Sequence, residues 1–84
     1  MYGVQTMSEY KWIRRMEDGI VFYLLTDGKS VLGHIHKGYG RYELELYLPS
    51  GGNTLVGFTR ILSKGKERLL KRYIQEVKPV ASEG

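Results

Sequence analysis

The hydrophobic periodicity of this 84-residue chain changes after Ile61, and that change constrains its fold more than any other feature. Before Ile61, apolar and polar side chains alternate in short runs bounded by Gly, Asp, Asn and Pro, which is typical of strands joined by tight turns. After it, apolar side chains recur at three- and four-residue intervals, which predicts an amphipathic helix. Its apolar stripe comprises Leu62, Leu69, Leu70, Tyr73, Ile74 and Val77. The order predicts an α+β fold: an antiparallel meander sheet of four to five strands followed by one C-terminal amphipathic helix.

The turn signals divide the chain into a single domain. We predict strands over residues 10–16, 20–26, 31–37, 41–48 and 54–61, and a helix over residues 62–78. Ser63 is a suitable N-cap for that helix, and Asp27-Gly28 is a dipeptide favoured in type I′ hairpin turns. We expect the domain to span residues 10–79. We expect residues 1–9 to form a disordered or extended leader, with either Met1 or Met7 as the start of the protein, and residues 80–84 to form a tail.

The composition excludes several classes of protein. The chain has no cysteine, which rules out disulfides, thiolate zinc sites and a cysteine nucleophile, and which fits a cytoplasmic location. No apolar run approaches the ~20 residues of a membrane-spanning helix. The glycine-rich segments resemble hairpin turns and not phosphate-binding loops, and no serine has a His–Asp context. We therefore expect no enzymatic activity, no cofactor and no membrane association.

Two histidines and two glutamates alternate on either side of the turn at residues 38–40. Apolar side chains of both strands face the same way if Ile35 lies opposite Leu44. This register pairs His34 with Glu45 and His36 with Glu43 on the outer face. Imidazole and carboxylate groups can bind zinc, but alternate side chains of a strand stand parallel, about 6.5 Å apart, and do not converge on one ion. We predict a polar ladder without a metal; a metal or acid–base site is the alternative.

The positive charge of the chain is concentrated near its C-terminus. Residues 62–78 carry six basic and two acidic side chains, which accounts for the whole net charge of +4. On a helix, Lys64, Arg68, Lys71 and Lys78 fall in one row, with Arg72 beside it. Such a basic stripe is the electrostatic feature expected of a protein with an anionic partner.

The aromatic side chains fall into two groups. We predict that Phe22, Tyr42, Phe58 and Tyr73 lie in the core, because each falls on an apolar stripe. The roles of two other aromatic side chains remain open. Trp12, in a basic strand with Arg14 and Arg15, either closes one end of the core or stacks on nucleic-acid bases. Tyr39, between two glycines at a hairpin tip, is either an exposed turn residue or a contact.

Residues 20–77 resemble a known family of DNA-binding domains. The segments "DGKSVLGHI" and "LYLPSGGNTLVGFTRILSKGKERLLKRYI" are similar to the Gly-Lys hairpin, strand end and leucine-containing helix of positive-cofactor-four-type transcriptional coactivators. That resemblance implies a ββββα fold and binding of single-stranded DNA. The element order is also similar to the sheet-plus-helix DNA-binding domains of AP-two factors and phage integrases. Glu43 and Glu45 depart from the coactivator pattern, which favours basic or aromatic side chains there.

Together these features predict a small, non-enzymatic and largely sequence-independent nucleic-acid-binding protein that contacts phosphates through a basic helix face. The candidate binding residues are Lys64, Arg68, Lys71, Arg72, Lys78, Trp12, Arg14, Arg15 and Tyr39. The sequence does not tell whether the nucleic acid is DNA or RNA, or whether it is single- or double-stranded. The alternative function is that of a small phage or mobile-element protein that inhibits or adapts a host protein. We also expect a homodimer, formed through the strand at 54–61 or the helix, because terminal strands leave edges that need cover.

Overall fold

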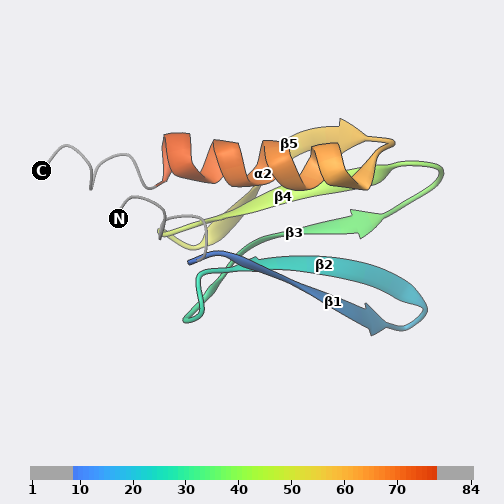
Figure 1. Cartoon of the computed structure of the whole chain (residues 1–84), viewed down its shortest axis with the longest axis horizontal. Coiled ribbons are helices and arrows are strands. Elements are labelled where there is room, and N and C mark those ends of the chain that lie inside the picture. Colours follow the sequence, from blue (N-terminus) through green and yellow to red (C-terminus); the bar gives the residue numbers. More distant parts are fainter. Residues whose placement is uncertain (1–8, 78–84) are drawn as a thin grey trace, which may run out of the picture.

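The computed structural model describes residues 9–77 and confirms the α+β architecture (Figure 1). Five strands form one antiparallel meander sheet in the order β1-β2-β3-β4-β5, and one helix follows. The elements are β1 (Lys11–Glu17), β2 (Ile20–Thr26), β3 (Val31–Lys37), β4 (Tyr42–Leu48), β5 (Gly52–Thr59) and α2 (Leu62–Glu76). β1 and β5 are therefore the two edges of the sheet.

The two-residue hairpin turn lies at a different Asp-Gly pair from the one predicted. The two-residue turn with positive φ at both positions is Asp18-Gly19, which joins β1 to β2. Asp27 instead begins a four-residue loop, where its carboxylate accepts hydrogen bonds from the backbone N–H groups of Lys29 and Ser30 at 2.8 and 2.9 Å. These bonds lower the pKa of Asp27, that from Ser30 contributing most. The type I′ prediction for Asp27-Gly28 is thus wrong.

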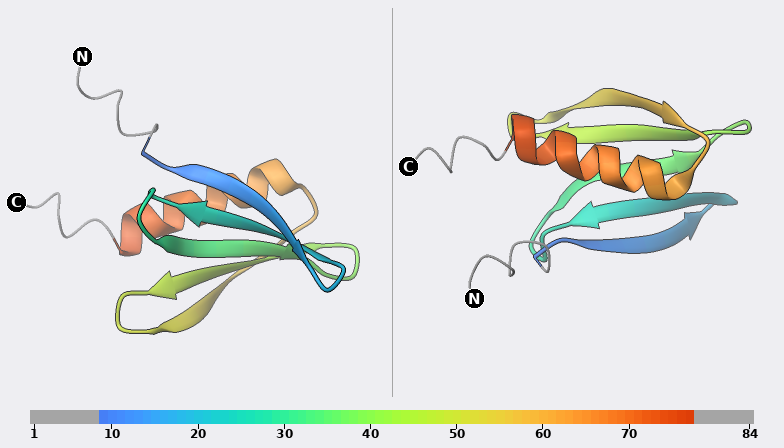
Figure 2. Two further views of the ribbon diagram at one scale, coloured as in Figure 1. Left: turned by 90° about the horizontal axis from the view of Figure 1, so that it is seen from below. Right: turned by 45° about the horizontal axis from the view of Figure 1, so that its top comes forward.

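The core lies between α2 and one face of the sheet. α2 packs on β3, β4 and β5, as the right view of Figure 2 shows. The fully buried side chains are Leu25, Ile35, Leu44, Leu46 and Leu69. The helix begins with Ile61 as N-cap and without a side-chain cap, so the prediction for Ser63 is wrong. Thr59 Oγ1 accepts the Ile61 N–H instead, at 3.2 Å.

Two glycines allow the helix to lie close to the sheet. A Cβ at Gly65, in the first turns of α2, would lie 2.9 Å from Thr59 Cγ2 and 3.0 Å from Leu44 Cδ2. A Cβ at Gly33, in β3, would lie 2.6 Å from the Glu45 carbonyl oxygen and 3.3 Å from Leu69 Cδ2. The backbone oxygen cannot move aside without distorting the sheet. Gly33 is therefore required for close packing of both β4 and α2.

We expect Gly33→Ala to lower the free energy of unfolding by about 1–3 kcal/mol, the usual cost of overpacking a core. Gly38→Ala is the matched control, because a Cβ there meets its nearest atoms at 3.7 and 3.8 Å. That variant should stay within about 0.5 kcal/mol of the parent. Urea denaturation measures both, and equal stability of the two variants would contradict the packing argument.

Candidate functional site

The basic face of α2 is exposed, as the sequence predicts. Lys64, Arg68 and Lys71 are exposed and Arg72 is half-buried. Lys78, the fifth member of the predicted set, lies outside the described residues. We call Lys64, Arg68, Lys71 and Arg72 the basic face. Beside it, a hollow of about 110 Å³ lies between the helix and β5; it is lined by Val56, Arg68, Lys71, Arg72 and Gln75.

Arg68 is held in place by β5. Its Nη1 donates a hydrogen bond of 3.0 Å to the carbonyl oxygen of Phe58. Its Nη2 lies 2.7 Å from the position that a Cβ of Gly57 would occupy, so the absence of a side chain there makes room for the guanidinium. A guanidinium has five N–H donors. One bond to the backbone therefore orients Arg68 and leaves donors for an external anion.

Arg72 is partly neutralised within the helix. Its Nε contacts the carboxylate of Glu76 one turn later, and both side chains are about half exposed. An exposed i,i+4 pair of this kind contributes only about 0.3–0.5 kcal/mol, so an external phosphate can compete for Arg72. Lys64, Arg68 and Lys71 are then the main cations of the face.

A larger groove lies on the other flank of the helix, between α2 and β1. Its volume is about 560 Å³, and it is lined by Trp12, Lys66, Glu67, Leu70, Lys71, Ile74 and Gln75. Most of the wall is apolar: the indole, two aliphatic side chains and the methylene stems of the lysines. Lys71 belongs to this groove and to the hollow on the opposite flank, so the two depressions meet at the crest of the helix.

Trp12 fills the first of the two roles that the sequence left open, packing at the core, and it is also accessible from a groove. It packs against the core cluster, and it forms the β1 wall of the groove. Lys66 Nζ lies 5.5 Å from the centre of the Trp12 ring and 5.3 Å from that of Tyr23. Lys66 was not among the residues predicted for the site. Because it comes three and four residues before Leu69 and Leu70, helical spacing could have placed it on the flank of the helix that faces the sheet.

The remaining predicted site residues are dispersed. Arg14 pairs with Tyr23 and shares the helix-facing side of β1 with Trp12. Arg15 points to the opposite face, where it lines a pocket with Phe22, His34 and Tyr47. Tyr39 is fully exposed at the β3–β4 hairpin, whereas Trp12 is near the other end of the sheet. The structure therefore brings Trp12 to the helix but separates Arg15 and Tyr39 from it.

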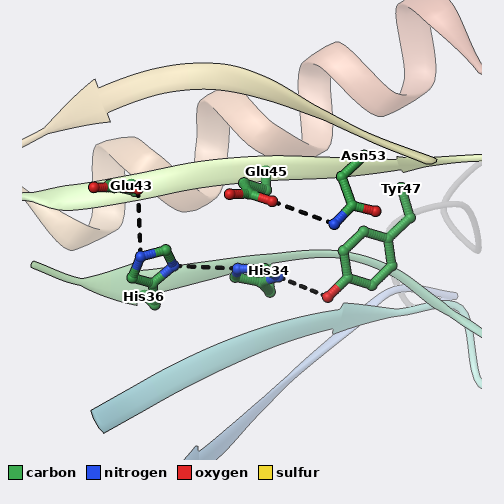
Figure 3. A network of polar contacts seen from close by, with 6 residues as sticks. All are labelled: His34, His36, Glu43, Glu45, Tyr47 and Asn53. Carbon is green, nitrogen blue, oxygen red and sulfur yellow. Dashed lines mark hydrogen bonds and ion pairs between the residues drawn. The ribbon is translucent and has the colours of Figure 1, made fainter.

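The outer face of the sheet, which α2 does not cover, carries the predicted polar ladder. Ile35 lies opposite Leu44, and the pairs His34–Glu45 and His36–Glu43 follow, which confirms the register. The contacts form a chain (Figure 3). His36 Nε2 lies 3.3 Å from Glu43 Oε1, His34 Nε2 lies 3.2 Å from His36 Nδ1, and His34 Nδ1 lies 2.6 Å from the Tyr47 hydroxyl.

One arrangement of protons satisfies this whole chain with both imidazoles neutral. Tyr47 O–H donates to His34 Nδ1, His34 Nε2–H donates to His36 Nδ1, and His36 Nε2–H donates to the Glu43 carboxylate. Glu45 stands apart and accepts a hydrogen bond of 3.4 Å from Asn53 Nδ2. Burial lowers the pKa of His34, against the opposing effect of Glu45, and burial also raises the pKa of Tyr47.

Two aromatic rings predicted in the core belong to this outer face. Phe22 packs against both imidazoles, with ring centres 5.6 Å from His34 and 5.8 Å from His36. Phe58 is 38% exposed, and the Cζ atom of Arg41 lies 3.9 Å from the centre of its ring. The prediction that Phe58 lies in the core is therefore wrong. Tyr42 and Tyr73 do pack against the core, as predicted.

Neither a metal-ligand cluster among the described residues nor a similarity to known proteins assigns a function to this chain. Among residues 9–77, no group of three or more His, Cys, Asp or Glu side chains is placed to hold a metal ion. Within the same span, no helix has the length and apolar character needed to cross a membrane. Searches of family models, curated proteins and solved structures find no match to this chain. The resemblance to coactivator domains stays a prediction.

The lowered pKa of His34 predicts a pH-dependent stability. The unfolded chain binds a proton at His34 near the ordinary value of 6.5, whereas the folded protein does so only at lower pH. Acid therefore favours the unfolded state. We expect the free energy of unfolding to be highest above about pH 6.5 and to fall as the pH drops through the lowered pKa of His34.

Urea denaturation between pH 5 and 7.5 measures this slope. His34→Gln removes the titrating group, so its slope should be flatter than that of the parent, whatever its absolute stability. Identical slopes would show that His34 does not cause the dependence.

Proposed function

We propose that this protein is a non-enzymatic nucleic-acid-binding protein that contacts phosphates through the basic face of α2, with little sequence preference. The observation that carries the proposal is the exposure of Lys64, Arg68 and Lys71 on one side of a helix that has five basic and two acidic side chains. From Lys64 to Lys71 the helix rises about 10 Å, which is about three phosphate intervals along one strand of B-DNA.

The chemistry of this face favours phosphate contacts over recognition of bases. Arg68 is oriented by its bond to the Phe58 carbonyl and retains donors for a bidentate phosphate contact. Lysine ammonium groups attract phosphates as point charges without a preferred partner base. Such contacts position a strand but do not read its sequence. The resemblance to single-stranded-DNA-binding coactivators and a cytoplasmic location form part of the same proposal.

A charge reversal on the helix tests the proposal. If about four phosphates are neutralised, the logarithm of the association constant should fall with the logarithm of salt concentration with a slope of roughly −3 to −4. Arg68→Glu/Lys71→Glu should weaken binding to all oligonucleotide sequences alike and make the slope shallower. Fluorescence anisotropy with labelled oligonucleotides over a salt series measures both effects.

The matched control is Lys11→Glu/Lys29→Glu, which changes the net charge equally at exposed positions away from α2. This variant should bind nearly as the parent does. Equal losses in the two double variants would mean that only net charge matters, and salt-independent binding would reject the proposal.

A second candidate function is docking on a protein, and the outer face of the sheet favours it. Four apolar side chains there are substantially exposed: Ile13, Ile20, Leu55 and Phe58, at 42, 43, 51 and 38%. They flank the polar chain of His34, His36 and Glu43 on both sides. A surface that mixes apolar and charged groups suits a second copy of the chain or a host protein, the partner of a small phage or mobile-element adaptor.

Sedimentation tests the homodimer that we include in this second candidate. The β5 edge, which adjoins Leu55 and Phe58, is a suitable interface, whereas β1 is charged along its length. We expect a dimer at high micromolar concentration that dissociates in Leu55→Asp. If the parent protein is monomeric at that concentration, the homodimer prediction is wrong.

A further inference from the structure

We propose that the groove between β1 and α2 holds an unpaired nucleobase stacked on Trp12, so that the ligand is a single-stranded or locally unpaired nucleic acid. This inference rests on the proposed function and names the substrate class that it leaves open. The groove is distinct from the basic face: it lies on the flank of the helix that faces β1, and its wall is mostly apolar.

The shape and lining of the groove suit a planar aromatic group. Its volume of about 560 Å³ falls within the ~300–1,000 Å³ typical of small-molecule sites. Trp12 forms one wall, and Leu70 and Ile74 form the helix side. Indole is a large stacking surface, and every base offers a π-face to it, so such a site tolerates any sequence.

The charges at the groove fit a base that is attached to phosphates. Lys66 Nζ lies 5.5 Å from the centre of the Trp12 ring, and Lys71 also lines the groove. Lys71 also borders the hollow formed with Arg68 and Arg72, so positive side chains connect the basic face to the groove, whose lining includes a single carboxylate, that of Glu67. An apolar protein side chain would gain nothing from this pair of lysines.

The polar groups in the groove do not select one base. Gln75 offers both a donor and an acceptor, and Glu67 offers acceptors, so each base edge finds some partner there. A base within a duplex is stacked and paired, and entering the groove would require its removal from the helix at a cost of a few kcal/mol. The groove therefore favours single strands over duplexes.

Trp12 is the only tryptophan of the chain, so its fluorescence reports on this groove alone. We would titrate the protein with three probes of equal charge per strand: a 12-nucleotide oligothymidine, its abasic counterpart with the same phosphates, and the corresponding duplex. Oligothymidine should quench the emission. The abasic strand should bind about 5- to 150-fold more weakly, the contribution of one stacked base, and without quenching.

Two variants separate stacking from folding. Trp12→Leu should weaken oligothymidine binding to the level of the abasic strand and leave abasic binding unchanged, while Trp12→Phe should retain most of the difference. Because Trp12 also packs on the core, circular dichroism must show that each variant is folded. If Trp12→Leu does not fold, Ile74→Gln, which changes only the helix side of the groove, should reduce the difference between the two strands.

The outcomes distinguish a failure of base stacking in the groove from a failure of phosphate binding by α2. Equal affinity for both single strands without a change in emission would overturn the groove inference and leave phosphate binding by α2 intact. Equal quenching by the duplex would also overturn it. Absence of binding to all three probes at low salt would reject the proposed function and the inference together.

Discussion

The architecture of this protein depends on one constraint: a single helix must cover a five-stranded sheet. A helix with its side chains is about 10–12 Å wide, whereas strands about 4.8 Å apart make this sheet about 20 Å across. α2 therefore covers β3, β4 and β5 and leaves the β1–β2 hairpin beyond its flank, as Figure 1 shows. The glycines at positions 33 and 65 fix this position, because they let the helix approach the sheet where a larger residue would prevent contact.

That off-centre position creates the groove and separates the two faces of the molecule. Trp12 reaches toward the helix from β1, and the gap between them is the groove. Lys66 and Lys71 line the helix side of the groove, and Lys64 and Arg68 are exposed elsewhere on the helix, so an anionic strand would meet positive charge along α2. The outer face carries charges of both signs: Lys11, Arg15 and Glu17 on β1, and Glu43 and Glu45 on β4. The side chains of its hydrogen-bonded chain are each other's partners, and the lowered pKa of His34 predicts that stability depends on pH.

Much of the fold could be predicted from the sequence, because alternation and turn residues are local signals. The pairing of Ile35 with Leu44 followed from two apolar stripes, and it placed both histidines correctly on the outer face. Phe58 was assigned wrongly because β5 contains a bulge. One extra residue, Val56, stands between the partners of Leu44 and Glu45, so the alternation reverses and Phe58 turns outward. The signal that could have found the bulge is Gly57, because an isolated glycine within a strand often marks one.

The candidate site was predictable only in part, because it combines residues that are far apart in the sequence. The basic face of α2 follows from helical spacing, but the groove joins Trp12 to residues more than fifty positions later. Local patterns do not tell which half of a sheet a helix covers. Tyr47 and Asn53 were likewise missed, although alternation with Glu43 and Glu45 puts Tyr47 on the outer face.

Amide chemical-shift mapping with an isotope-labelled protein and an unlabelled 12-nucleotide oligothymidine tests the central claim most directly. The account predicts that the largest shifts fall on residues 64–75 and on the indole N–H of Trp12, while the amides of His34, His36 and Tyr47 on the outer face stay unchanged. Shifts concentrated on the outer face, or none at low salt, would contradict it.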